Sequence, residues 1–165
     1  MSNQNSTSTK AILKAWLIAG TLDISCALLY YYIKSGNNPL DVLVTVSRFA
    51  LGKEILTSEV LGNKPLMWAL GLIVHYTIAF AWTILFFWSW PRVSFLQKDK
   101  IITGLAYGAF IWIVMNLAVI PMRAMRWPPY ILQNILIGGV ILMLAVGLPV
   151  SIIIGNYYSK RSAST

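Results

Sequence analysis

Four long apolar stretches, separated by short polar segments, dominate the hydrophobic pattern of this chain. They cover residues 11–33, 66–90, 101–120 and 130–157, and each holds the roughly 20 apolar residues that a helix needs to cross the hydrocarbon core of a bilayer. Pro91 follows the second stretch and Pro121 the third, and a proline favours the end of a helix because it lacks an N–H. The pattern predicts an all-α, polytopic membrane protein with a bundle of four transmembrane helices.

The two ends of the chain differ from this pattern. Residues 1–10 are polar and have no apolar periodicity, so we expect a disordered tail, and residues 159–165 form a second polar tail. The membrane domain is therefore predicted to cover residues 11–158. The first stretch is too long for a signal peptide and no small-x-small cleavage site follows it, so we expect it to remain as a span.

The first outer loop contains a signal for a short helix. Asn38, Pro39 and Asp41 supply an N-cap, a proline at the first helical position and an acid in the first turn. We expect a helix over residues 39–51, ended by Gly52; its length of about 20 Å is too short to cross. Its polar residues fall on one narrow stripe: Asp41, Thr45 and Arg48. This pattern predicts an interfacial or re-entrant helix, which either caps the outer ends of the spans or gates a pore.

Composition and charge agree with a membrane location. The chain is 58% hydrophobic and 11% charged, against about 45–50% and 25% in soluble domains, so a soluble globule is excluded. The net charge is +8, but the charges lie between the apolar stretches, which indicates contact with a membrane surface and not with nucleic acid. Aromatic residues gather at the span ends, as in interfacial belts: Tyr30, Tyr31, Tyr32, Trp88, Trp90, Trp127, Tyr130, Tyr157 and Tyr158.

The distribution of lysine and arginine predicts the orientation. Four spans put both termini on one side of the membrane, where seven basic residues lie, against six on the other side. Lys10, Lys14 and Arg92 lie close to span ends, where the positive-inside rule has most weight. We therefore expect both termini in the cytoplasm.

Small residues mark the faces on which the spans pack, because helices in a membrane associate where their backbones approach closely. Gly104 and Gly108 form a GxxxG motif in the third span. Gly20 belongs to a small face of the first span, and Gly71 to a stripe of the second that also includes His75. These faces serve packing within the chain or dimerisation of subunits.

Asp23 is the costliest residue in the spans, since an acid near the centre of a helix costs about 2.5–3.5 kcal/mol on insertion. It lies about 18 Å into the first span, and His75 lies about 14 Å into the second span from the opposite side. In a core about 30 Å thick the two residues share nearly the same depth. An Asp23–His75 contact is therefore compatible with the sequence.

Further polar residues extend this hypothetical intramembrane site towards the outer surface. Asn116 lies near the outer end of the third span, and Gln133 and Asn134 open the fourth span on the same side. Each of them either makes a helix–helix hydrogen bond worth about 0.6 kcal/mol or lines a path for protons, an ion or a small polar ligand.

The sequence contains no recognised catalytic or metal-binding motif. There is one cysteine, Cys26, and one histidine, and neither a GxSxG nor an Asp-rich metal motif occurs. We therefore expect no metal and no cofactor.

The stretch GLAYGAFIWIVMNLAVIPM, residues 104–122, opens with a glycine pair, carries Met115-Asn116 and leaves through Pro121. Together with His75 and Gly147-Leu148-Pro149 it resembles the YagU-like family of small uncharacterised bacterial inner-membrane proteins. The resemblance covers most of the chain from the second span to the fourth. It implies a four-helix bacterial inner-membrane protein and supplies no activity. The family pattern has a second histidine before Gly-Leu-Pro, where this chain has apolar residues, and this departure argues against a paired-histidine metal site.

The sequence leaves three classes of function open. The first is a non-enzymatic membrane component, such as a scaffold or accessory subunit that assembles with itself or with another membrane protein. The second is an oligomeric proton- or cation-linked transporter or channel that uses Asp23 and His75. The third is a lipid-acting membrane enzyme, which ranks last because isolated polar groups would have to supply its chemistry.

Overall fold

The computed structural model describes residues 2–55, 58–119 and 132–162. These residues form helices and turns, without a strand. Four segments are long and apolar enough to cross a membrane: Thr7–Ser35, Lys64–Ser89, Lys100–Val119 and Leu136–Ser162. The predicted all-α bundle of four membrane-spanning helices is confirmed.

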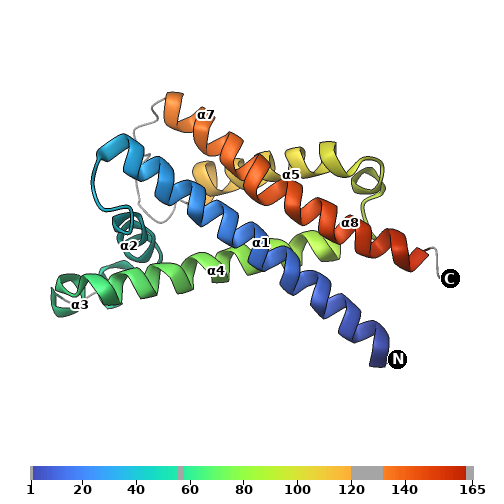
Figure 1. Ribbon diagram of the computed structural model, residues 1–165, viewed down its shortest axis with the longest axis horizontal. Helices are drawn as coiled ribbons and strands as arrows, with labels where there is room; N and C mark the ends of the chain where they lie inside the picture. Colours follow the sequence, from blue (N-terminus) through green and yellow to red (C-terminus); the bar gives the residue numbers. More distant parts are fainter. Residues whose placement is uncertain (1, 56–57, 120–131, 163–165) are drawn as a thin grey trace.

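The spans are built from helices that run back and forth between two ends of the bundle (Figure 1). The first two spans are α1 (Ser2–Ser35) and α4 (Lys64–Ser89). The third joins α5 (Lys100–Val114) to a π-helix, η2 (Met115–Val119). The fourth joins α7 (Leu132–Ile141), a π-helix η3 (Leu142–Gly147) and α8 (Leu148–Ser162).

Both termini lie at one end of the bundle, and the short helices α2 (Asp41–Ile55) and α3 (Ser58–Gly62) lie at the other (Figure 1). A 3-10 turn, η1 (Ser94–Gln97), connects α4 to α5 at the end with the termini. Helix α1 packs against α4 and α8, and α5 packs against α8 and η3. The order of the spans therefore gives each long helix an antiparallel neighbour.

Helix α1 begins at Ser2, so it includes most of the segment for which the sequence predicts a disordered tail, residues 1–10. This segment contains neither glycine nor proline, so the helix continues from the stable apolar span at little cost. The hydroxyl of Ser8 is also hydrogen-bonded to the hydroxyl of Tyr157 on α8. Helix α8 likewise extends to Ser162, into the second predicted polar tail.

The short helix of the first outer loop is present as α2. The Asn38 side chain accepts a hydrogen bond from the backbone N–H of Leu40 at 3.0 Å, so it caps the chain just before the helix. The helix continues past Gly52 to Ile55, which corrects the expected end, since a glycine within a helix costs only about 1 kcal/mol. Lys64 at the start of α4 forms an ion pair with Asp41, with 3.5 Å between Nζ and Oδ2.

Glycines mark the close helix crossings. A Cβ atom on Gly108 would lie 2.4 Å from the Cα atom of Met143, and one on Gly147 would lie 2.0 Å from the carbonyl oxygen of Gly104. The backbones of α5 and η3 are therefore in direct contact, and the GxxxG motif of the third span packs within the chain. A Cβ atom on Gly71 would meet the backbone of Leu43, so this glycine allows α2 to pack closely against α4.

The buried core lies in the half of the bundle nearest the termini. Phe86 of α4 and Tyr107 of α5 are at its centre, with ring centroids 4.5 Å apart, and the Tyr107 hydroxyl donates to the carbonyl oxygen of Trp82 at 2.7 Å. The remaining buried members come from all four spans: Ala15, Ala19, Trp90, Ile111, Val146, Val150 and Ile154. This core holds the four spans together, and it lies nearer to the chain termini than Asp23 and His75 do.

Candidate intramembrane polar site

The candidate site forms where α1 crosses α4 near the middle of both helices. Gly20 of α1 is buried, and a Cβ atom there would lie 3.0 Å from the Tyr76 ring and 3.5 Å from the Cβ atom of Ala79. The small faces predicted for these two spans thus meet each other at Gly20 and Ala79. Their close approach brings polar groups of α4 to the backbone of α1.

At this close approach, the side chain of His75 forms a hydrogen bond with the backbone of α1. Its Nε2 atom lies 2.9 Å from the carbonyl oxygen of Gly20. A carbonyl oxygen accepts and does not donate, so Nε2 carries the proton in this contact. The contact uses one of the two ring nitrogens and leaves Nδ1 for another partner.

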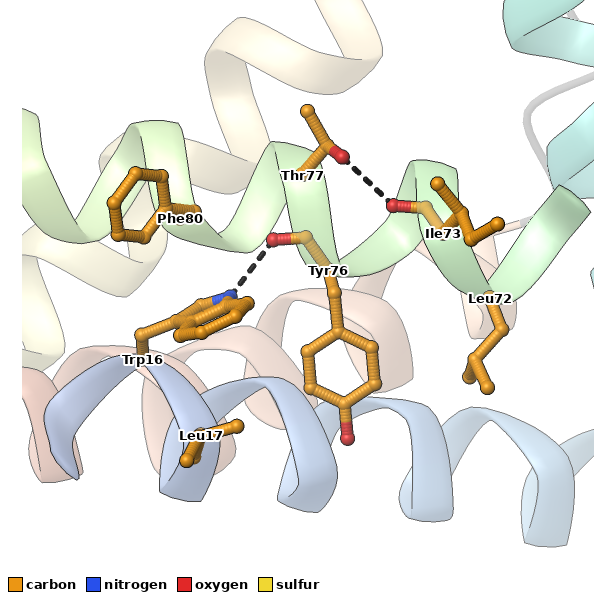
Figure 2. A pocket seen from close by; sticks show the side chains of 7 residues that line it. All are labelled: Trp16, Leu17, Leu72, Ile73, Tyr76, Thr77 and Phe80. Carbon is orange, nitrogen blue, oxygen red and sulfur yellow. Dashed lines mark hydrogen bonds between the residues drawn. The ribbon is translucent and has the colours of Figure 1, made fainter. Parts of the chain in front are cut away.

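Two further hydrogen bonds join the same pair of helices. The indole N–H of Trp16 donates to the carbonyl oxygen of Tyr76 at 2.8 Å (Figure 2). The hydroxyls of Thr21 and Tyr76 lie 2.8 Å apart. The rings of Trp16 and Tyr76 also meet edge to face, with centroids 5.9 Å apart. The polar atoms of these side chains therefore stabilise the α1–α4 contact.

Asp23 differs from these neighbours. It is partly buried one turn beyond Gly20, and within the described part of the chain its carboxyl group makes neither a hydrogen bond nor an ion pair. His75 is close enough to act on this carboxyl electrostatically, although its Nε2 atom bonds to Gly20 instead. The two residues thus share a depth and an environment, without a direct hydrogen bond between them.

A groove of about 530 Å³ opens beside the α1–α4 contact. It is lined by Trp16 and Leu17 of α1 and by five residues of α4 between Leu72 and Phe80 (Figure 2). Neither Asp23 nor His75 is among the residues that line this groove.

Among the further residues predicted for the site, Asn116 has a described side chain and Gln133 and Asn134 do not. The Asn116 amide donates to the carbonyl oxygen of Trp112 on its own helix at 3.0 Å, and no contact with Asp23 or His75 is found among the described residues. Gln133 and Asn134 lie on α7, and their side chains are outside the described residues. Within the described residues, the polar site therefore comprises Asp23 and His75 and does not continue to Asn116 of η2.

Sequence reasoning did not find the roles of Trp16 and Thr21. A usable signal was present for their common partner, because Tyr76 lies ten residues into the second predicted span, away from the aromatic belts at the ends. Tryptophan and tyrosine carry a polar atom that needs a partner when buried. An aromatic residue of this kind at mid-span therefore indicates a hydrogen bond across a helix contact.

The fold and the site together define a class, an all-α multi-pass membrane protein with a polar contact in its interior. Comparison of the chain with protein-family models, with curated proteins and with solved structures finds no match. Among the described residues, no three His, Cys, Asp or Glu side chains gather in a way that could hold a metal ion.

Proposed function

We propose that this chain is a non-enzymatic component of a bacterial inner membrane, a scaffold or accessory subunit that assembles with itself or with another membrane protein. The observation that carries the proposal is the use made of the polar atoms at the α1–α4 crossing. His75, Trp16 and the Thr21–Tyr76 pair all form hydrogen bonds that join the two helices. Polar side chains used in this way act as helix-packing groups.

The location and orientation belong to the same proposal. The resemblance to the YagU-like family supports a bacterial inner membrane. The basic residues near the span ends, Lys10, Lys14 and Arg92, support cytoplasmic termini through the positive-inside rule.

A second candidate function is proton- or cation-linked transport by an oligomer, and Asp23 is the observation that favours it. Ionisable residues within membrane spans are costly and mark ion pathways in many transporters. The carboxyl of Asp23 lies in the neighbourhood of the His75 ring, and a carboxyl and an imidazole have the chemistry of a proton-binding pair. Four spans are few for a pore within one chain, so such a path would run between subunits.

Flux measurements separate the two candidates. The purified chain would be reconstituted into vesicles with an internal pH-sensitive dye, and proton entry would be followed after an imposed pH gradient, with valinomycin and potassium to prevent a membrane potential. Sodium uptake would be measured in parallel. We expect the wild type to match protein-free vesicles.

Two variants test whether any flux depends on Asp23. Asp23→Asn removes the intramembrane charge, and Asp41→Asn is the matched control because Asp41 belongs to α2 in the outer loop. Proton or sodium flux through the wild type that Asp23→Asn abolishes and Asp41→Asn retains would overturn the scaffold proposal in favour of transport.

A further inference from the structure

The end of the bundle that holds the termini carries an excess of positive charge. Seven basic residues lie there with one acidic residue, Asp99. The basic residues come from the start of α1, from the α4–α5 connection and from the end of α8: Lys10, Lys14, Arg92, Lys98, Lys100, Lys160 and Arg161. All except Lys100 are exposed. We call these seven residues the basic end.

Asp99, the acidic residue of this end, forms hydrogen bonds within the chain. Its carboxylate accepts hydrogen bonds from the backbone N–H groups of Ile101 and Ile102, at 2.7 and 3.0 Å. It therefore serves as the N-cap of α5, where a negative charge stabilises the helix terminus. At the opposite end, in contrast, Lys64 has an acidic partner in Asp41.

Aromatic side chains place the basic end at the level of lipid headgroups. Tyr158 of α8 stacks on Trp90 at the end of α4, with ring centroids 6.4 Å apart, and Trp88 is 61% exposed. Tryptophan and tyrosine prefer the interface between hydrocarbon and water. The cations beside them therefore lie where phosphate groups of lipids are found.

Two arginines from distant parts of the chain lie in the neighbourhood of Tyr158. Arg92 follows α4 and Arg161 lies in the last turn of α8, and both are near enough to the Tyr158 hydroxyl to act on it electrostatically. The Arg92 guanidinium donates to the carbonyl oxygen of Trp88, which orients it and leaves further N–H groups for an acceptor, since a guanidinium has five. Arginine matches the geometry of a phosphate group.

We propose that the basic end is a binding surface for anionic phospholipid headgroups, with the lipid phosphodiester between Arg92 and Arg161 beside Tyr158. Basic residues close to a membrane surface attract anionic lipids. The interfacial aromatic residues distinguish this surface from one that binds a soluble anion, because they fix it at headgroup depth.

The test compares lipids on the intact chain in detergent. Melting temperature and bound lipid, the latter by native mass spectrometry, would be measured with phosphatidylglycerol, with phosphatidylcholine of the same acyl chains, and with inorganic phosphate. We expect phosphatidylglycerol to bind at least tenfold more tightly than phosphatidylcholine and inorganic phosphate to give no shift. Equal binding of the two lipids, or an equal shift with inorganic phosphate, would overturn the proposal.

Charge-removing variants locate the surface. Arg92→Gln/Arg161→Gln should lower the preference for phosphatidylglycerol by about fivefold for each charge removed, and Lys34→Gln/Arg48→Gln at the opposite end is the matched control. Lys10→Gln/Lys14→Gln provides a second variant at the basic end, on exposed positions of α1, if the arginine variant fails to fold. An undiminished preference in whichever of these basic-end variants folds would contradict the assignment.

Discussion

The Nε2 atom of His75 lies 2.9 Å from the carbonyl oxygen of Gly20. This contact joins the middle of α4 to the middle of α1 through a side chain on one helix and the backbone of the other. It depends on Gly20, because a side chain there would press against the Tyr76 ring. A small residue on α1 and a polar residue on α4 thus act together to hold the two spans.

Replacement of His75 tests the energetic value of this contact. His75→Ala removes the hydrogen-bond donor to Gly20, and we expect the free energy of unfolding in detergent to fall by about 0.6–1.7 kcal/mol, from the average to the maximum found for hydrogen bonds between membrane helices. His75→Gln should retain most of the stability, since its amide N–H can reach the same carbonyl. Thr77→Ala is the control, because the Thr77 hydroxyl bonds within α4 and its loss should have little effect.

Replacement of Asp23, unlike replacement of His75, should not lower the free energy of unfolding. Its carboxyl group makes no hydrogen bond among the described residues, so Asp23→Asn replaces a desolvated carboxyl group by an amide without removing a hydrogen-bond partner. We expect the free energy of unfolding to stay constant or to rise, by at most about 3 kcal/mol. A thermal melt of the purified variant measures this, and a clear loss of stability would show that the charge itself is paired in the folded protein.

The α5–η3 crossing should be the position least tolerant of added volume. Gly108→Ala places a Cβ atom against the backbone of Met143, so the helices must separate, and we expect a loss of about 1–3 kcal/mol. Gly139→Ala on α7, in the fourth span, is a matched control, because the added Cβ atom would lie 3.9 Å from its nearest neighbour, the Trp112 ring. Equal melting temperatures for the two variants would mean that Gly108 does not sit at a close crossing.

The positions of the chain ends predict a labelling pattern. Thr7 lies at the end of the bundle with the termini and Gly62 at the end with α2 and α3. In a Cys26→Ala background, an impermeant maleimide should label Gly62→Cys on intact cells and Thr7→Cys only after permeabilisation. We prefer Gly62 to its neighbour Asn63, whose side chain caps α4 by accepting from Leu66 N at 3.1 Å. Labelling of position 7 from outside would reverse the proposed orientation.

The spans could be predicted from the sequence because hydropathy and length determine them almost alone. The π-helix η3 was less visible, although it ends at Gly147, two residues before Pro149. A proline has no N–H and displaces the carbonyl four residues earlier, so a wider turn before it is a physical consequence. The exact type of turn depends on the packing of Gly147 against α5, which the sequence does not specify.

The sequence predicts how deep in the membrane the site lies, but it does not predict the hydrogen bond that His75 makes. Counting residues placed Asp23 and His75 at one level, and the structure has them close together. Which group His75 bonds depends on the rotation of α1 by a fraction of a turn, and hydropathy does not report this rotation. The same limit applies to Gly71, which shares a stripe with His75 but packs against Leu43 of α2, because the docking position of a short loop helix leaves little trace in the pattern.

A disulfide trap tests the α1–α4 crossing most directly. A Cβ atom on Gly20 would lie 3.5 Å from the Cβ atom of Ala79, within the range of about 3.5–4.5 Å that a disulfide requires. The variant Gly20→Cys/Ala79→Cys/Cys26→Ala would be oxidised in membranes and then denatured and treated with a maleimide-linked polyethylene glycol. Leu22→Cys/Ala79→Cys in the same background is the control, since Leu22 is 44% exposed. The account predicts no mass addition to the first variant and two additions to the control; two additions to both would contradict the crossing on which the candidate site and the proposed function depend.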